Sequence, residues 1–288
     1  MSIARSTRRN HPVPHPFLKW AGGKGQLLPE LQQRIALAEP FQRYHEPFVG
    51  AGALFFDLYR SERLKPDQGQ QAFLSDSNIR LMETYLGLRD HTERVMRLLA
   101  MHQARHDKEY YYAVRAELPE GLAARAARII YLNRTCFNGL FRENRRGEFN
   151  VPMGAYINPR ICDETNHQAV AQALQGVWLD VAPFETVLER AKAGDLVYFD
   201  PPYHPLSRSA SFTKYNKDDF NEDDQRRLAE VFATLTDNGV KVLLSNSMTP
   251  LIQELYGAYT FETVQATRNV NSRADRRGKI DEALVRNF

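Results

Sequence analysis

Short apolar runs alternate with longer, helically spaced runs in the first and last parts of the chain. Four short runs have the length and turn-rich boundaries of buried strands: 73–76, 177–181, 196–199 and 240–244. Helical spacing is clearest in two segments: 27–38 and 222–236. Asn221 precedes the second of these as an N-cap. This alternation predicts an α/β fold on a parallel sheet, closed by a last pair of strands at 259–267 and 283–288.

The middle of the chain has a different pattern. Three helical segments follow one another there without strand-like runs between them: 79–103, 108–118 and 123–132. The alternation of strand and helix resumes near Val177. We therefore expect an inserted, mostly helical lobe at 79–167, a first domain made of 16–78 and 168–288, and a flexible tail at 1–15.

Four residues, Asp200-Pro201-Pro202-Tyr203, end the apolar run that starts at Asp195. Ligands of α/β proteins bind where such a strand stops and a loop begins. Asp200 and the carbonyl of Pro201 could each accept one N–H of an exocyclic amine, while Tyr203 stacks on the attached ring. An ordinary aspartate has a pKa of about 3.9, so we expect Asp200 to orient the amine and stabilise the ammonium that forms. The alternative is a plain surface turn.

A glycine-rich turn stands upstream of these four residues. Phe48 and Val49 end a predicted strand, and Gly50 and Gly52 let the backbone approach a nucleotide-like ligand before a helix begins near Ala53. Asp76, 24 residues past Gly52, ends the next strand and is suited to holding a ribose diol. The turn lacks the third glycine of a dinucleotide site and the Lys-Ser/Thr pair of a phosphate loop. This pattern favours an adenosine without phosphates, such as S-adenosylmethionine.

Four ordered motifs resemble the alpha-group, or Dam-type, adenine-specific DNA methyltransferases. They are PFLKWAGGK at 16–24, FVGAGALFFDL at 48–58, LNRTCFNGLFR with GEFNVP at 132–152, and YFDPPY at 198–203. The similarity runs from about residue 16 to the C-terminus. It implies a Rossmann-like methyltransferase sheet that uses S-adenosylmethionine, and an inserted DNA-recognition lobe that bears a β-hairpin.

The resemblance also implies roles for individual residues. Catalytic roles are implied for Asp200, Pro201, Pro202 and Tyr203. Cofactor contacts are implied for Trp20, Ala21, Gly22, Gly23, Lys24, Phe48, Gly50, Gly52, Asp76, Phe184 and Asp200. DNA contacts are implied for Lys19, Arg134, Phe137, Asn138, Leu140, Arg142, Asn144, Asn150, Pro152 and Tyr156. The family match implies a GATC site and extrusion of the target adenine, and Arg142 is our choice for guanine because an arginine fork engages both acceptors on that edge.

Several of these residues have simpler interpretations. Phe137, Leu140 and Trp20 could be packing residues. Three basic clusters could be solvated surface or tail: Arg5 with Arg8 and Arg9; Arg142 with Arg145 and Arg146; and Arg273 with Arg276, Arg277 and Lys279. The formal charge is only +3, so affinity for nucleic acid has to come from such local clusters.

The remaining composition bounds the environment. Cys136 and Cys162 form no Cys-x-x-Cys pair, so we expect two reduced thiols, no zinc site and no other metal. No apolar run approaches the roughly 20 residues of a membrane span, and the polar segment 2–15 lacks the core of a secretory signal. We expect a cytoplasmic monomer that contacts double-stranded DNA and no membrane. Whether a cognate restriction endonuclease accompanies it, as in a restriction-modification system, stays open at this point.

Two other functions compete with DNA adenine methylation. One is methylation of an RNA base or of a protein glutamine amide, since related tetrads serve planar amides. The other is a DNA-binding regulator without catalysis, against which the intact tetrad and glycine turn argue. Labelled cofactor and duplex DNA would separate the three.

Overall fold

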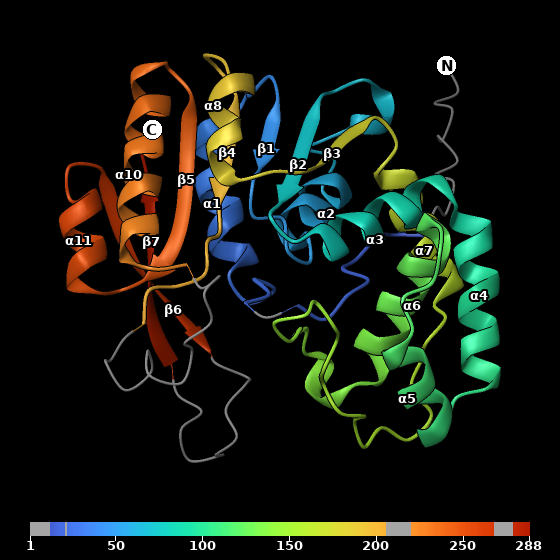
Figure 1. The fold of residues 1–288 in the computed structure, drawn as a ribbon. Helices are drawn as coiled ribbons and strands as arrows, with labels where there is room; N and C mark the ends of the chain where they lie inside the picture. Colours follow the sequence, from blue (N-terminus) through green and yellow to red (C-terminus); the bar gives the residue numbers. More distant parts are fainter. Residues whose placement is uncertain (1–11, 21, 206–219, 268–278) are drawn as a thin grey trace, which may run out of the picture. The chain divides into compact units, whose positions relative to one another are not determined.

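The computed structural model describes residues 12–20, 22–205, 220–267 and 279–288. Within them, the chain divides into two compact units, which are described separately below. The first unit contains residues 1–19 and 84–175, and the second contains 20–83 and 176–288. The sequence placed the domain boundaries after residue 78 and before residue 168, and it assigned residues 16–19 to the domain with the sheet. In the structure the units change after residues 83 and 175, and residues 16–19 belong to the first unit. Helix α3 (Ile79–Asp90) contains the first boundary (Figure 1).

The second unit is built on a seven-stranded sheet with the order β3-β2-β1-β4-β5-β7-β6. Its strands are β1 (Tyr44–Glu46), β2 (Ala72–Asp76), β3 (Val177–Val181), β4 (Leu196–Phe199), β5 (Lys241–Ser247), β6 (Thr260–Thr267) and β7 (Lys279–Arg286). The first five in this order are parallel, and β7 lies antiparallel between β5 and β6. The predicted α/β class and the strands are confirmed, but β1 ends at Glu46 and not at Val49, because the chain turns there into the glycine loop.

The helices of the second unit follow the predicted pattern where the sequence has a strong period. They are α1 (Leu28–Ala38), α2 (Ala53–Arg60), α8 (Val187–Arg190), α10 (Glu222–Asp237) and α11 (Pro250–Tyr256), with short 3-10 turns at η1 (Pro66–Gln68) and η3 (Phe184–Thr186). The N-cap predicted at Asn221 is confirmed: its side chain accepts from the amides of Asp223 and Asp224, and Asp224 accepts from the amide of Asn221. This capping box fixes the start of α10.

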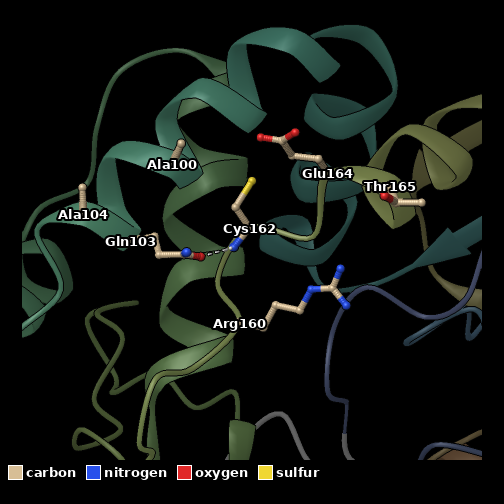
Figure 2. A pocket seen from close by; sticks show the side chains of 7 residues that line it. All are labelled: Ala100, Gln103, Ala104, Arg160, Cys162, Glu164 and Thr165. Carbon is tan, nitrogen blue, oxygen red and sulfur yellow. Dashed lines mark hydrogen bonds between the residues drawn. The ribbon is translucent and has the colours of Figure 1, made fainter.

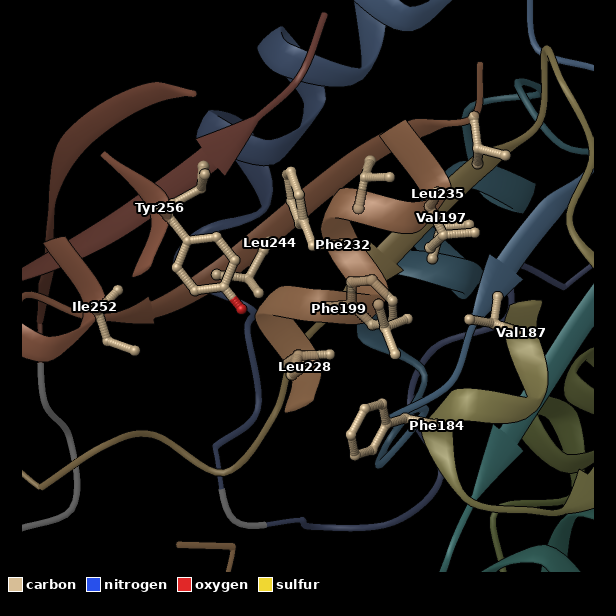
Figure 3. Packing of buried hydrophobic residues seen from close by; sticks show 14 of the residues in the cluster. Phe184, Val187, Val197, Phe199, Leu228, Phe232, Leu235, Leu244, Ile252 and Tyr256 are labelled. Carbon is tan, nitrogen blue, oxygen red and sulfur yellow. The ribbon is translucent and has the colours of Figure 1, made fainter. Parts of the chain in front are cut away.

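The two faces of the sheet carry different side chains. On one face, apolar residues of β4, β5 and β7 pack with α10 and α11 into a buried cluster that includes Val197, Phe199, Leu244, Phe232 and Leu228 (Figure 3). Neighbouring positions along a strand point to opposite faces. The other face therefore carries the alternate residues of the same strands, and these are largely polar near the carboxyl ends.

The first unit is mainly helical. Its helices are α4 (Thr92–Ala104), α5 (Lys108–Ala116), α6 (Leu122–Thr135) and α7 (Glu164–Ala173), with a 3-10 turn at η2 (Phe137–Gly139). Tyr111 and Tyr131 are fully buried, and α6 contacts both α4 and α5. The helical insertion predicted between residues 79 and 132 is confirmed, whereas α7 was not predicted. In the described ranges, no helix is both long and apolar enough to cross a bilayer.

Candidate functional site

Asp200 follows β4 directly, and its Oδ1 atom contacts two side chains of the second unit. Lys24 Nζ lies 2.8 Å from it, and Ser245 Oγ donates to it at 2.9 Å. Lys24 is itself buried. Its ammonium also donates to the Gly22 carbonyl at 2.7 Å and lies 4.3 Å from the centre of the Tyr203 ring. The structure thus brings the predicted loop at 22–24 and the predicted tetrad together around one cation.

The rest of the tetrad is held by hydrogen bonds from elements distant in the sequence. Gln225 of α10 donates through Nε2 to the Pro202 carbonyl at 3.0 Å, and its Oε1 accepts from Asn246 Nδ2 at 3.0 Å. The Tyr203 hydroxyl donates to Glu282 Oε2 of β7 at 2.7 Å. These contacts leave the segment 200–203 little freedom to move as a surface turn would.

Burial dominates the electrostatics of this region. Desolvation raises the pKa of Asp200, and the ammonium of Lys24 and the Ser245 hydroxyl oppose that effect. The expectation that Asp200 has an ordinary aspartate pKa is therefore wrong: its pKa is raised, because the fold removes the carboxylate from water to a degree that the sequence does not show. Burial also raises the pKa of Glu46, at the end of β1, to about 8, although Tyr44 donates to it at 2.8 Å.

The glycine turn follows β1, the strand beside β4. Gly50 has φ of 49°, and a side-chain carbon there would lie 3.2 Å from the Trp20 indole. Its amide donates to Asp76 Oδ2 at 3.2 Å, and the amide of Asn78 donates to Oδ1 at 2.9 Å. Burial raises the pKa of Asp76. Gly52, with φ of 67°, begins α2.

The order of the strands explains why these segments meet. β2 and β4 flank β1, so the chain after β1 and the chain after β4 leave the sheet at the point where the strand order reverses. A crevice forms at such a point because successive connections depart on opposite sides. The glycine turn and the tetrad follow the two neighbouring strands at this point.

Aromatic rings gather beside the glycine turn. The ring of Phe48 stacks on Phe184 with centroids 5.4 Å apart, and it meets Phe199 and Phe220 edge to face. Phe184 is buried, whereas Phe48 is partly exposed. The structure thus brings together Phe48 and Phe184, two of the three aromatic residues assigned to the cofactor. Ala21, another assigned position, lies outside the described residues.

In the first unit, Lys19 is held beside the loop after α6. Asn133 clamps the backbone of Lys19, accepting from its amide at 2.7 Å and donating to its carbonyl at 2.7 Å, and it also donates to the Gly139 carbonyl at 2.9 Å. The Lys19 ammonium lies 4.3 Å from the centre of the Tyr156 ring. Lys19 and Tyr156, both assigned to DNA, therefore form one cluster with Asn133.

The segment 137–152 is less regular than the predicted β-hairpin. It pairs in antiparallel fashion only through isolated bridges, Cys136 with Met153 and Glu143 with Phe149, so the described loop has no continuous two-stranded ladder. Asn144 shapes its tip, because its side chain accepts from the amides of Arg146 and Glu148. The nitrogen of the same side chain donates to Glu148 Oε2 at 2.7 Å, so both ends of the Asn144 amide are used within the loop, and its contact with phosphate stays a prediction.

The remaining DNA-assigned residues of this loop differ in exposure. Phe137 is 51% exposed and Leu140 is 39% exposed, which disfavours the interpretation of both as core packing. Asn138 adopts a left-handed conformation with φ of 54°. The exposed Arg142 donates to the side chain and carbonyl of Asn150 at 2.6 and 3.2 Å. The exposed Pro152 accepts from the Phe137 amide at 2.8 Å.

Arg134 lies apart from the exposed loop residues. It is partly buried, it donates to the Phe17 carbonyl at 2.8 Å, and burial lowers its pKa. Its role at DNA stays a prediction. Two of the three basic clusters also stay predictions: Arg5, Arg8, Arg9, Arg273, Arg276 and Arg277 lie outside the described residues, and so does the side chain of Lys279.

Sequence reasoning missed the residues that support the site. Ser245, Gln225, Glu282 and Asn133 each contact an assigned residue, and Asn246 in turn holds Gln225. One signal was available: Ser245-Asn246-Ser247 ends an apolar strand at the edge of the sheet where ligands bind. The other three lie on helices or on a strand whose partners the sequence does not reveal.

A shallow groove of about 540 Å³ lies in the first unit, and none of the DNA-assigned residues lines it (Figure 2). It is lined by Ala100, Gln103, Ala104, Arg160, Cys162, Glu164 and Thr165. The Cys162 amide donates to Gln103 across it at 3.0 Å. Among the residues that the structure describes, no group of three or more His, Cys, Asp or Glu side chains is arranged to hold a metal ion.

Residues 20–270 match the family model described as D12 class N6 adenine-specific DNA methyltransferase. The chain is 40% identical over 281 residues to the Type II methyltransferase M1.LlaDCHI of Lactococcus lactis, covering 95% of both chains. It is 39% identical to the Type II methyltransferase M.MjaIII of Methanocaldococcus jannaschii, covering 95% of this chain and 99% of the other. It is 35% identical to a DNA adenine methylase of Escherichia coli, covering 93% and 94%.

Proposed function

We propose a specific form of adenine methylation from one premise: the chain belongs to the D12 class N6 adenine-specific DNA methyltransferases. It is a site-specific adenine-N6 DNA methyltransferase, and DNA is its substrate. The proposal is that it methylates a flipped-out adenine within GATC in duplex DNA, with S-adenosylmethionine as the methyl donor. The contact of the tetrad with Lys24 and Ser245 is the observation that carries it, since this contact fixes one partly buried carboxylate that can accept from an amine.

Enzymes of this family use S-adenosylmethionine, which supplies an electrophilic methyl group when bound. The residues present fit an adenosine-containing donor. Gly50 offers bare backbone beside Trp20, and Asp76 ends β2 next to this turn, where it could accept from ribose hydroxyls. We assign Trp20, Gly22, Lys24, Phe48 and Phe184 to the same pocket, together with Gly23, Gly52, Asp200 and Ala21.

The target amine is a weak nucleophile because its lone pair is delocalised into the ring. We assign Asp200 and the Pro201 carbonyl as acceptors for its two N–H groups, which orients the amine toward the donor. Tyr203 is held by Glu282 and is positioned to stack on the adenine ring. Extrusion of the base from the duplex costs a few kcal/mol, and stacking on Tyr203 offsets part of that cost.

Recognition of GATC is assigned to the loop of the first unit and to Lys19. Arg142 reads a guanine through its guanidinium fork, while Leu140, Pro152 and Tyr156 contact neighbouring bases and Phe137 enters the stack beside the target. Two of these, Phe137 and Leu140, are solvent-exposed apolar residues, as an insertion into DNA requires. Asn144 and Asn150 are assigned to phosphates of the duplex, Asn138 lies beside the wedge residue Phe137, and Arg134 is assigned to DNA.

The test is digestion of DNA from cells that express the protein in a host without adenine methylation. A nuclease blocked by methylated GATC should no longer cut, and one that requires methylated GATC should begin to cut. Sequencing that detects N6-methyladenine should find the mark in GATC alone. Methyladenine in another sequence would reject GATC and leave the activity intact, while its absence from a protein shown to be folded would contradict the proposal.

Two of the three relatives named above are Type II methyltransferases. We therefore propose that this protein protects DNA against a cognate restriction endonuclease with the same target. Plasmid DNA methylated by the protein should resist that nuclease. We also propose that it acts as a monomer, since one chain contains every assigned residue, and sedimentation with and without a duplex tests this.

A further inference from the structure

Ser245 holds the proposed catalytic carboxylate without belonging to the assigned cofactor or DNA contacts. It lies on β5, is fully buried, and donates to Asp200 Oδ1 at 2.9 Å. The register of the sheet causes this contact. Phe199 pairs with Leu244, so the next residue along each strand, Asp200 and Ser245, stand beside one another on the polar face.

A second hydroxyl stands behind Ser245. Tyr198 Oη lies 2.9 Å from Ser245 Oγ and is also fully buried. A serine hydroxyl has one proton. Because Ser245 gives that proton to the Asp200 carboxylate, the Tyr198 hydroxyl has to be the donor between the two. The three groups form a directed chain from Tyr198 through Ser245 to Asp200.

This chain and Lys24 use the same oxygen. In the part of the chain that the structure describes, the contacts of the Asp200 carboxylate go to Oδ1, from Lys24 and from Ser245. A carboxylate that is fixed at one oxygen cannot rotate about its last bond. Its Oδ2 atom then keeps one direction, which is what an acceptor for a single N–H needs.

We propose that Ser245 is a positioning residue for methyl transfer: with Tyr198 behind it, it fixes Oδ1 of Asp200 and leaves Oδ2 to accept an N–H of the substrate amine. The inference rests on the proposed role of Asp200. It goes beyond that role because it assigns the two carboxylate oxygens to different tasks. A hydrogen bond to a charged acceptor such as a carboxylate is stronger than one between neutral groups.

The main test is Ser245→Ala in single-turnover methylation of a duplex that the wild-type protein methylates. Loss of one hydrogen bond to a carboxylate should slow the methyl-transfer step roughly 10-fold to 100-fold, with the affinity for the duplex unchanged. Ser245→Thr, which keeps the hydroxyl, should retain most of the rate. Thermal unfolding of each variant establishes that it is folded.

The pH profile gives a readout that a merely structural role would not change. Ser245 lowers the pKa of Asp200, so its loss should move the acid limb of the rate profile to higher pH. The other groups that face Asp200, namely Lys24, Glu46, Tyr198 and Tyr203, are unchanged in the Ser245→Ala variant. A shift of that limb therefore reports the lost donor.

Tyr198→Phe tests the chain itself. It should slow methyl transfer less than Ser245→Ala does, and it should have no further effect when combined with Ser245→Ala, because its only route to Asp200 is removed. Tyr256→Phe is the matched control. Tyr256 is also buried in the second unit, its hydroxyl has no partner among the described residues, and the change should leave the rate as it is.

Asp200→Ala distinguishes the proposed role of Asp200 from that of Ser245. If Asp200→Ala methylates at the wild-type rate, the proposed role of Asp200 falls. If Asp200→Ala is inactive while Ser245→Ala keeps both the rate and the pH profile, only the positioning role of Ser245 is overturned. Equal losses for Tyr198→Phe in both backgrounds would overturn the directed chain.

Discussion

Glu46 shows how burial can set the charge of a single side chain against its usual behaviour. It ends β1, is 2% exposed, and accepts from the Tyr44 hydroxyl. Its pKa of about 8 means that it carries a proton at neutral pH, and the nearby Asp200 carboxylate adds to the burial effect. An ionised Glu46 would place a second negative charge close to the carboxylate assigned to catalysis. A protonated one does not.

This protonation predicts a dependence of stability on pH. Between the ordinary value of 4.5 and about 8, folded Glu46 holds a proton that the unfolded chain has released. Stability therefore falls as pH rises through that window, by at most about 1.4 kcal/mol per pH unit, and is flat above it. Glu46→Gln should remove this slope, as measured by denaturant unfolding from pH 5 to 9.

The exposed Glu230 on α10 provides the control. Glu230→Gln should leave the wild-type slope in place over the same range, because the Glu230 side chain is exposed to water in the folded protein as it is in the unfolded chain. If Glu46→Gln and the wild type gave parallel curves, Glu46 would not be the group that takes up the proton.

The position of Arg142 leads to a prediction about recognition of a guanine. Its guanidinium is held on the exposed loop by Asn150, which accepts from Nε and from Nη2. Arg142→Ala should weaken binding by about 1–3 kcal/mol at a duplex with the correct guanine, and should weaken binding to a duplex with that guanine replaced much less. Fluorescence titration with both duplexes measures this, and an equal loss for both would make Arg142 a backbone contact.

At the scale of elements, α10 connects stability and the site. Its capping box fixes the first turn, and Gln225 of that same turn holds the Pro202 carbonyl. Asn221→Ala should lower the free energy of unfolding by about 1 kcal/mol, since two amides lose their acceptor. Asn238→Ala, the same change at the exposed other end of α10, should have little effect. Denaturant unfolding compares the two, and equal losses would argue against the cap.

The elements also show what a sequence can and cannot predict. Apolar runs gave β3 and β4 at their observed bounds, and the helical period gave α1 and α10, because each pattern is local. α7 and α11 were missed, since α7 is rich in alanine and polar residues and α11 spans only seven residues. The hairpin was predicted from its turn residues, which indicate a reversal of the chain but not how many bridges form.

The site shows the same division between local and distant information. The motif at 198–203 and the glycine turn could be read from neighbouring residues. Their supports could not, because Ser245 is 45 positions from Asp200 and Glu282 is 79 positions from Tyr203. Only the folded sheet brings such pairs together. The shifted pKa values of Asp200 and Glu46 belong to this second class, since burial is a property of the fold.

At the scale of the whole molecule, charge is nearly balanced, with a formal net charge of +3. We therefore expect attraction to DNA to depend on local cations such as Arg145 and Arg146, which are exposed in the loop 137–152. Each phosphate contact contributes roughly 0.9 to the slope of log K against log salt concentration. Arg145→Ala and Arg146→Ala should each reduce that slope by about 1, measured by titrations over a salt series. Asp200→Ala should leave it unchanged, and an unchanged slope in the arginine variants would exclude phosphate contacts.

Consecutive residues of β5 serve opposite sides of the sheet: Ser245 reaches Asp200, and Asn246 reaches Gln225 on α10. A single inserted residue before this pair would exchange the two sides, sending an amide toward the carboxylate and a hydroxyl toward the helix. Both anchors would fail in one step. A two-residue insertion would restore the alternation but carry Ser245 about 7 Å along the strand, beyond reach of Asp200. This stretch of β5 should therefore tolerate neither length change, which methylation by a series of insertion variants would expose.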